Sequence, residues 1–247
     1  MSALTSLLRR VYGLWWIVLP PIVGSAVMAM IIGAIVVAPR EIIEGDVQRL
    51  LYIHFPSILA AYGAFGVVFV ASLVVLWKRD LRWDAVARGA ATVGVLFTGL
   101  TLATGALWGK PIWGVYWTWD ARLTSTLVLF LIYAAYLLAR SMADELDEQA
   151  ARFAAVFAVL GALDIPLVMF SVTWWRTLHP QPIIMRGLER PAMPAEMLAV
   201  LMIAFLGIGA LALWLGVLRT EAEWLAKRTA TLRAQIDRRE GDRHEGA

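Results

Sequence analysis

The sequence contains no cysteine, few charged residues and only three histidines. Without cysteine, the chain cannot form a disulfide framework, an iron–sulfur cluster, a cysteine zinc site or a Cys-x-x-Cys-His haem attachment motif. Charged residues make up only 17% of the chain, whereas hydrophobic residues make up 60%, and the mean hydropathy is +0.70. This balance is far from that of a soluble domain and indicates an integral membrane protein.

The chain also lacks the local motifs of several enzyme classes. It has no phosphate-binding loop, no metalloprotease helix motif and no apparent set of serine, histidine and acid for nucleophilic catalysis. The formal net charge is only +3, and no basic stripe with interleaved aromatic residues occurs outside the carboxyl-terminal tail. We therefore expect neither an enzyme in its own right nor a nucleic-acid-binding protein.

Long apolar runs dominate the sequence instead. Six can be delimited, at residues 14–38, 53–77, 86–107, 122–139, 153–175 and 196–218. Each is close to the ~20 residues that an α-helix needs to cross a hydrocarbon core. Because backbone polar groups must be paired within lipid, we predict an all-α integral membrane protein with six transmembrane helices. The first run is longer than the apolar region of a signal peptide, so we expect a retained anchor.

Lysine and arginine residues indicate how these helices are oriented. Fifteen lie before the first run, at 78–88, at 140 and 152, and in the tail at 219–247, whereas seven lie in the connections of the other face. Because basic segments tend to stay in the cytoplasm, we predict that both termini are cytoplasmic. Residues 1–218 then form a transmembrane domain, and residues 219–247 form a cytosolic tail that is helical or disordered.

The connection between the third and fourth runs is unusually rich in aromatic residues. Residues 108–125 contain Trp108, Trp113, Tyr116, Trp117 and Trp119, followed by Asp120 and Arg122. Tryptophan is large, flat and amphipathic, and one or two such residues would be ordinary interfacial anchors. Five aromatic rings in one short connection, closed by an acid and an arginine, predict a surface that holds a flat ligand on the outer face.

Two of the three histidines fall on that same outer face. His54 stands at the outer mouth of the second run, and His179 follows the fifth run just after Trp174 and Trp175. A neutral imidazole is a common ligand of haem iron, so two of them beside flat aromatic rings suit an iron porphyrin. Taken alone, either histidine could equally be a polar residue at the membrane interface.

Two arginines and an aspartate complete this group. Arg122 follows the aromatic run, and Arg176 lies between Trp175 and His179. Guanidinium groups bind carboxylates through paired hydrogen bonds, which makes both arginines candidates for the haem propionates. Arg122 could instead extend its charge to the lipid headgroups. We expect Asp120 to cap the fourth helix, with the positioning of Arg122 or of a ligand as a second role.

These residues together resemble a known motif. The run Trp108-Gly-Lys-Pro-x-Trp113-Gly-x-x-Trp117-x-Trp119-Asp120-Ala-Arg122-Leu-Thr124 is similar to the WWD motif of haem-handling proteins. With six apolar runs and a histidine on each flank, the chain resembles the haem exporter protein C (CcmC) family of bacterial cytochrome c maturation, from about residue 10 to 218. Tyr116 departs from the motif, because the family often has a further tryptophan there, but it keeps a flat ring.

The resemblance implies a relay for haem in the bacterial inner membrane. In that family a non-covalent, b-type and transient haem sits on the periplasmic side. There His54 and His179 would ligate the iron, and the aromatic motif would dock the porphyrin. The family passes haem to a membrane-anchored periplasmic haem chaperone and works with a small single-span membrane subunit and the subunits of an ABC transporter. Alternatives are a permease subunit for haem or another solute, and part of an enzyme that attaches haem to cytochrome c.

Two further features stand apart from this group. Asp164 lies midway along the fifth run, and we expect it to be protonated or bonded to backbone freed by a kink at Pro166. In the tail, residues recur at spacings of four and three: Leu218, Ala222, Leu225, Thr229, Leu232 and Ile236. This stripe predicts an amphipathic helix that lies on anionic lipid or contacts a partner, with disorder from Gly241 onward.

Overall fold

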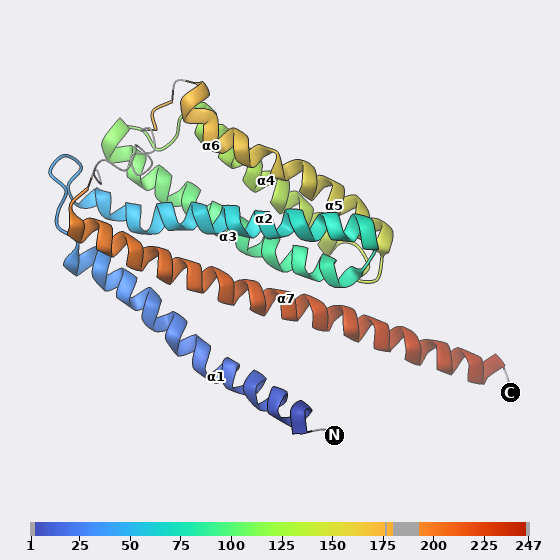
Figure 1. Cartoon of the computed structure of the whole chain (residues 1–247). Helices are drawn as coiled ribbons and strands as arrows, with labels where there is room; N and C mark the ends of the chain where they lie inside the picture. The colour runs from blue at the N-terminus through green and yellow to red at the C-terminus, as the bar shows by residue number, and fades with distance from the viewer. Residues whose placement is uncertain (1–2, 176, 180–192, 246–247) are drawn as a thin grey trace.

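The computed structural model describes residues 3–175, 177–179 and 193–245, which contain helices and no β-strand (Figure 1). The elements are α1 (Ala3–Ile32), the π-helix η1 (Gly33–Val37), the 3₁₀-helix η2 (Asp46–Leu50), α2 (Leu51–Lys78), α3 (Leu81–Trp113), α4 (Ala121–Ser141), α5 (Glu148–Ala162), α6 (Asp164–Trp174) and α7 (Ala195–Glu245). Six stretches of the described chain are helical, long and apolar enough to cross a membrane. The prediction of an all-α membrane protein with six spanning helices is confirmed.

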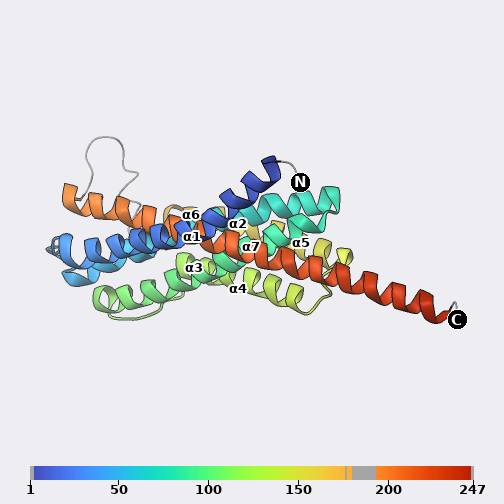
Figure 2. The ribbon, with the colours of Figure 1, turned by 90° about the horizontal axis from the view of Figure 1, so that it is seen from below.

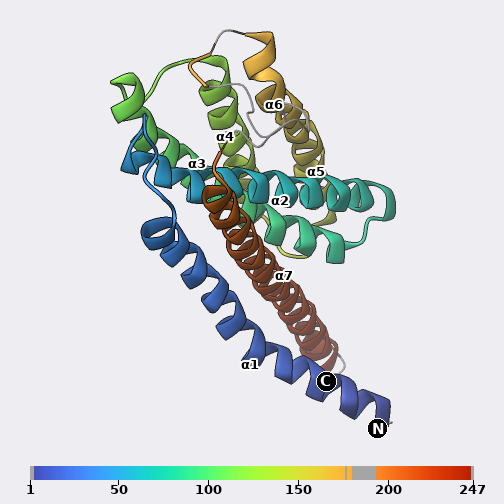
Figure 3. The same cartoon turned by 60° about the vertical axis from the view of Figure 1, so that its left-hand side comes forward.

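The six spans run back and forth, so that both termini lie at the same end of the molecule (Figure 1). α2 packs along α3, α7 packs against α1, α2 and α3, and α4 packs against α3, α5 and α6. The α2–α3 and α4–α5 turns share the end with the termini, which we call the terminal end (Figures 1 and 3). The α3–α4 connection and the last turn of α6 lie at the opposite end, which we call the motif end.

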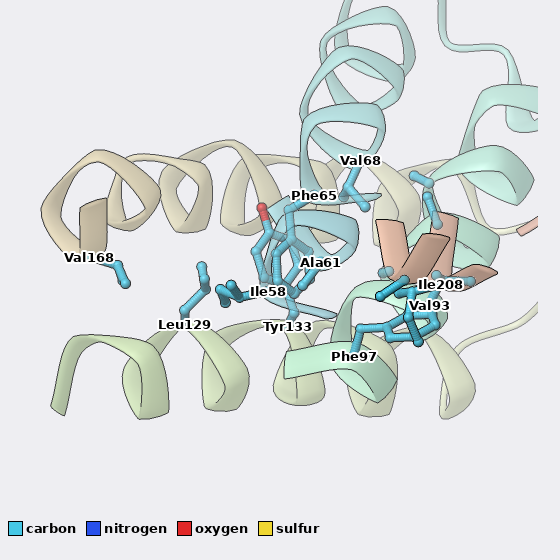
Figure 4. Packing of buried hydrophobic residues seen from close by; sticks show 14 of the residues in the cluster. Ile58, Ala61, Phe65, Val68, Val93, Phe97, Leu129, Tyr133, Val168 and Ile208 are labelled. Carbon is cyan, nitrogen blue, oxygen red and sulfur yellow. The ribbon is translucent and has the colours of Figure 1, made fainter. Parts of the chain in front are cut away.

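The centre of the bundle is a packed apolar core (Figure 4). Phe65 of α2 stacks on Tyr133 of α4 with ring centroids 3.9 Å apart, and the Tyr133 hydroxyl donates to the Ala158 carbonyl of α5 at 2.9 Å. Gly94 of α3 faces Phe65 so closely that an added Cβ would lie 2.3 Å from the ring. Glycine therefore permits the close approach of α2 and α3, and this contact fixes the elements whose ends carry the predicted site.

The fifth span is interrupted. The predicted run 153–175 consists of α5 and α6, which are separated at Leu163. Asp164 begins α6, and Pro166, which cannot donate a backbone hydrogen bond, follows two residues later. The Asp164 Oδ2 atom is buried without a hydrogen-bond partner among the described residues, so this oxygen does not bind backbone freed by the break.

α7 is much longer than the sixth apolar run. It continues without interruption from the span into the tail and reaches Glu245, so the prediction of disorder from Gly241 onward is wrong up to that residue. Figures 1 and 2 show the last turns of α7 extending past the ends of the other helices. Arginine, alanine and glutamate are the commonest residues from 219 to 245, and all of them favour a helix.

Candidate functional site

The aromatic motif is divided between a helix and a connection. Trp108 and Trp113 lie in the last turns of α3, so the connection covers only residues 114–120 rather than the predicted 108–125. α3 ends because Gly114 adopts a left-handed conformation, with φ of 77°, and its N–H donates to the Lys110 carbonyl at 3.0 Å. The Lys110 ammonium in turn donates to the Gly114 carbonyl at 2.8 Å and lies 5.3 Å from the centre of the Tyr116 ring.

His54 lies in the first turns of α2 and faces the end of α3. Its Nδ1 atom is 3.1 Å from the Thr104 hydroxyl, whose single proton is donated to the Leu100 carbonyl at 2.7 Å. With that proton on the Leu100 carbonyl, the hydroxyl oxygen accepts from His54 Nδ1, and this tautomer carries its lone pair on Nε2. The Trp108 ring meets the imidazole edge to face, with centroids 5.9 Å apart.

His179 reaches the same end of the bundle from the segment after α6. Its Nδ1 atom lies 3.4 Å from Asp120 Oδ2, and its ring meets Trp113 at 5.0 Å between centroids. Burial lowers the pKa of His179 below its usual value; the positive charge of Arg122 lowers it further, while Asp120 acts in the opposite direction. The imidazole is consequently neutral at pH 7, which is the form that ligates a metal.

Asp120 has two structural roles. Its Oδ1 atom accepts from the Leu123 backbone N–H at 2.8 Å and caps the start of α4, so the predicted capping role is confirmed. Its Oδ2 atom faces His179. A carboxylate on one ring nitrogen fixes both the orientation and the tautomer of an imidazole and leaves the other nitrogen to a metal.

Arg122 supplies positive charge near the two histidines. Its charge acts on both His54 and His179, and its guanidinium also lies near the Tyr62 hydroxyl of α2. The ion pairs formed within the described ranges do not include Arg122, so a carboxylate of a ligand would meet an uncompensated guanidinium there. Arg176, the second predicted arginine, lies outside the described residues.

The remaining aromatic rings form two exposed groups. Trp117 and Trp119 meet edge to face at 5.5 Å in the α3–α4 connection, and Trp119 is 76% exposed. Trp174 packs against Trp175 at 5.8 Å at the end of α6, and both are about half exposed. The structure gives no ring contact that joins these two groups within the described chain, whereas the histidines contact only the α3 tryptophans, Trp108 and Trp113.

Two contacts of the candidate site residues have no signal in the sequence. Glu44, in the loop between η1 and η2, accepts from the Trp108 indole N–H at 2.9 Å and fixes the orientation of that ring. Thr104 holds His54, although it lies within an apolar helix and 50 residues away in the chain. Neither residue belongs to a recognisable spacing pattern, and only the packing of α2 on α3 brings them to the site.

The donor set at the motif end fits an iron porphyrin. Two imidazoles have Nδ1 bound to an acceptor, which leaves Nε2 for iron, and Arg122 suits a propionate. Three more polar atoms at this end are buried without a hydrogen-bond partner among the described residues: Trp117 Nε1, Thr118 Oγ1 and Thr124 Oγ1. Because such atoms are normally paired, these groups are available to a polar ligand.

Known proteins are similar in sequence to this chain over most of its length. A family model described as "Heme exporter protein C" matches residues 4–235. The chain is 34% identical over 195 residues to "Heme exporter protein C" of Haemophilus influenzae, covering 79% of this chain and 78% of the relative. It is 41% identical over 172 residues to the protein of the same name from Bradyrhizobium diazoefficiens (68% of this chain and 65% of the relative), and 36% identical over 157 residues to that of Escherichia coli K12 (63% of each). The match to the Bradyrhizobium relative thus spans slightly less than two thirds of its length.

Proposed function

The chain belongs to the haem exporter protein C family, and we propose that it binds haem at the periplasmic face of the bacterial inner membrane and delivers it to a periplasmic haem chaperone. Residues 1–218 form the haem-handling membrane domain, and residues 219–247 form the cytosolic tail. The haem is a non-covalent, b-type cargo, and the chain acts as a relay without catalysis of its own.

One observation carries this proposal. His54 and His179 come from segments far apart in the sequence, yet each meets a tryptophan of the α3 end and each has its Nδ1 atom on a hydrogen-bond acceptor. This arrangement supports ligation of haem iron by Nε2. Haem supplies the iron and the two carboxylates, while the chain supplies imidazoles, flat indole surfaces and the Arg122 guanidinium.

The position of the site supports an exchangeable cargo. His54 lies in the first turns of α2 and His179 after α6, both at the motif end, and Tyr116 and Trp119 of the α3–α4 connection are exposed. A haem at this place can be reached from the lipid and from a periplasmic protein. A haem for permanent electron transfer would instead be clamped between histidines at mid-membrane.

The expected partners follow from the family. They are the membrane-anchored periplasmic haem chaperone, a small single-span membrane subunit, the subunits of an ABC transporter and the lipid bilayer, with no nucleic acid. The predicted orientation, with both termini in the cytoplasm, puts the motif end in the periplasm. The chaperone would then meet the aromatic surface directly, and ATP hydrolysis would occur on another subunit.

Replacing Asp120 with asparagine is expected to weaken haem binding by about 10–100-fold, the usual effect of removing a group that orients a metal ligand. Asparagine still caps α4, but its uncharged amide cannot hold the Nδ1 proton of His179 as firmly. Titration of the purified variant with haem, followed by absorption, measures the change. The Asp120→Ala variant should in addition lose about 1 kcal/mol of stability with the cap. An Asp120→Asn variant with unaltered haem affinity would remove Asp120 from the site.

A transfer assay tests the proposed function as a whole. The purified chain in lipid nanodiscs is loaded with one equivalent of haem and mixed with the isolated soluble domain of a periplasmic haem chaperone. After separation, absorption spectra report which protein carries haem. We expect haem to pass to the chaperone more rapidly than from protein-free nanodiscs that hold the same amount of haem.

The possible failures of this assay have different meanings. If the chain shows no haem spectrum in either redox state, the proposal of a haem-binding site is wrong. If it binds haem but transfers no more than the protein-free nanodiscs do, the proposed relay function is wrong, and a permease subunit becomes the better interpretation. Covalent attachment of haem to an added apocytochrome by the chain alone would show an attachment enzyme.

A further inference from the structure

The carboxyl-terminal turns of α7 extend beyond the bundle. α7 has 51 residues, so at 1.5 Å per residue it is about 75 Å long, whereas a bilayer core is about 30 Å thick. Figures 1 and 2 show the excess projecting beyond the terminal end. Because the helix continues in the direction of its span, its distal part points away from the membrane surface rather than along it.

Buried ion pairs fix one face of α7 just before this projecting segment. Lys227 donates to Asp84 of α3 at 2.7 Å, and Glu223 pairs with Arg88 of α3 at 2.9 Å. Glu223 and Lys227 are only 4% and 5% exposed. Arg140 at the end of α4 holds Asp84 from the other side at 2.9 Å. These pairs set the rotation of α7 about its own axis, and so they determine which residues face outward.

The outward face carries an apolar seam. Leu225, Leu232 and Ile236 are 53%, 52% and 55% exposed, and they lie seven and four residues apart. With Leu218, Ala222 and Thr229 they complete the alternation of four and three that characterises a coiled-coil seam. The side chains of Leu225, Leu232 and Ile236 are thus about half exposed, which is unusual for apolar residues on a helix that projects into water.

The charges beside the seam indicate what covers it. Arg228 and Arg233 flank Thr229 on opposite sides of the stripe, and both are exposed. Two copies in one membrane would have to pair their tails in parallel, and this register would place Arg228 of each copy against Arg233 of the other. Like charges at these positions are repulsive, so the sequence disfavours a second copy and favours a helix with acidic residues opposite Arg228 and Arg233.

We propose that the α7 seam, defined as Leu218, Ala222, Leu225, Thr229, Leu232 and Ile236, binds an amphipathic helix of a partner protein. The partner helix presents an apolar seam flanked by aspartate or glutamate opposite Arg228 and Arg233. The buried pairs of Glu223 and Lys227 hold the seam in position for it. This interaction lies at the end of the molecule opposite the haem site and is independent of haem binding.

A pair of designed peptides tests the proposal. Both are 28-residue helices with leucine along the seam; one carries glutamate at the positions that face Arg228 and Arg233, and the other carries lysine there. Fluorescence anisotropy measures binding of each labelled peptide to the full chain in nanodiscs. We expect the Kd of the acidic peptide to be at least about tenfold lower, because its charges pair with the arginines. Leu225→Gln with Leu232→Gln should abolish this binding, whereas Thr231→Gln, exposed on another face of the same turns, should not.

Reversing the charge of Arg228 and Arg233 distinguishes recognition of the peptide charges from a loss of structure in α7. Arg228→Glu with Arg233→Glu should reverse the preference, so that the lysine peptide binds more tightly than the acidic one. Equal affinity for the two peptides, binding that survives loss of the leucines, or no binding would overturn the proposal. A chain that sediments as a dimer and becomes monomeric with Leu225→Gln and Leu232→Gln would assign the seam to a second copy. A polarity-sensitive dye on Leu232→Cys that blue-shifts only with anionic lipid would assign it to the membrane.

Discussion

Replacement of both His54 and His179 with alanine is expected to abolish detectable haem binding by the purified chain, and each single replacement should weaken or alter the bound haem. Each imidazole presents Nε2 as the available nitrogen, because its Nδ1 atom is held by Thr104 or by Asp120. Without the two nitrogens the iron has no protein ligand at this end, and only contacts with flat rings and Arg122 remain. Absorption spectra in the oxidised and reduced states measure both the amount of haem and its ligation.

A third histidine provides a matched control. His244 lies in the tail, far along the sequence from the motif, and His244→Ala should leave the spectrum unchanged. If the two single variants at His54 and His179 both kept the wild-type spectrum, the proposed ligand pair would be wrong. A change in one variant alone would show a single protein ligand, and the other histidine would then act through its contact with Trp108 or Trp113.

The sequence predicts the fold well because one physical constraint dominates it. Every apolar run near 20 residues must become a helix in lipid, and six such runs correspond to the six spanning stretches of the structure. The interruption at Leu163 could not be predicted, because a proline within a run can either bend a helix or end it. The stripe to Ile236 predicted the helix in the tail, but its last turns up to Glu245 could not be predicted, since a polar helix and a polar disordered tail have similar composition.

Only part of the candidate site could be predicted from the sequence. The residue types of the WWD motif and the two flanking histidines indicate the chemistry, but their partners depend on tertiary packing. Asp120 and His179 are 59 residues apart, and Glu44 and Trp108 are 64 apart. The cap formed by Asp120 could be predicted because it is local, whereas its contact with His179 could not. The assignment of the histidines and tryptophans to haem stays a prediction.

The contacts of the basic residues at the terminal end could not be predicted either, because they too depend on tertiary packing. By sequence, the arginines and lysines near this end serve only to orient the chain. In the structure, Arg140 is 1% exposed and pairs with Asp84, which also accepts from Lys227, a residue 143 positions away. A single carboxylate therefore joins α3, α4 and α7, and a count of charges along the chain cannot reveal such a junction.

Replacing Asp84 with asparagine is expected to destabilise the chain by about 3–5 kcal/mol, the cost of leaving buried charges without their partner. Asp84 accepts from Arg140 at 3.2 and 2.9 Å and from Lys227 at 2.7 Å, and both cations are almost fully buried. The Arg140 Nη1 atom already has no hydrogen-bond partner among the described residues, so little remains to compensate the guanidinium. Unfolding in a titration with denaturing detergent, followed by tryptophan fluorescence, measures the loss.

Asp80→Asn is the matched control for this prediction. Asp80 lies four residues before Asp84 and caps α3 by accepting from the Arg82 backbone N–H at 2.9 Å. Asparagine caps a helix about as well as aspartate, so this variant should stay within about 0.5 kcal/mol of wild type. If Asp84→Asn unfolded at the same detergent concentration as Asp80→Asn, the junction would not hold α7 against the bundle. The fixed outward direction of the Leu225 and Leu232 side chains would then lose its physical cause.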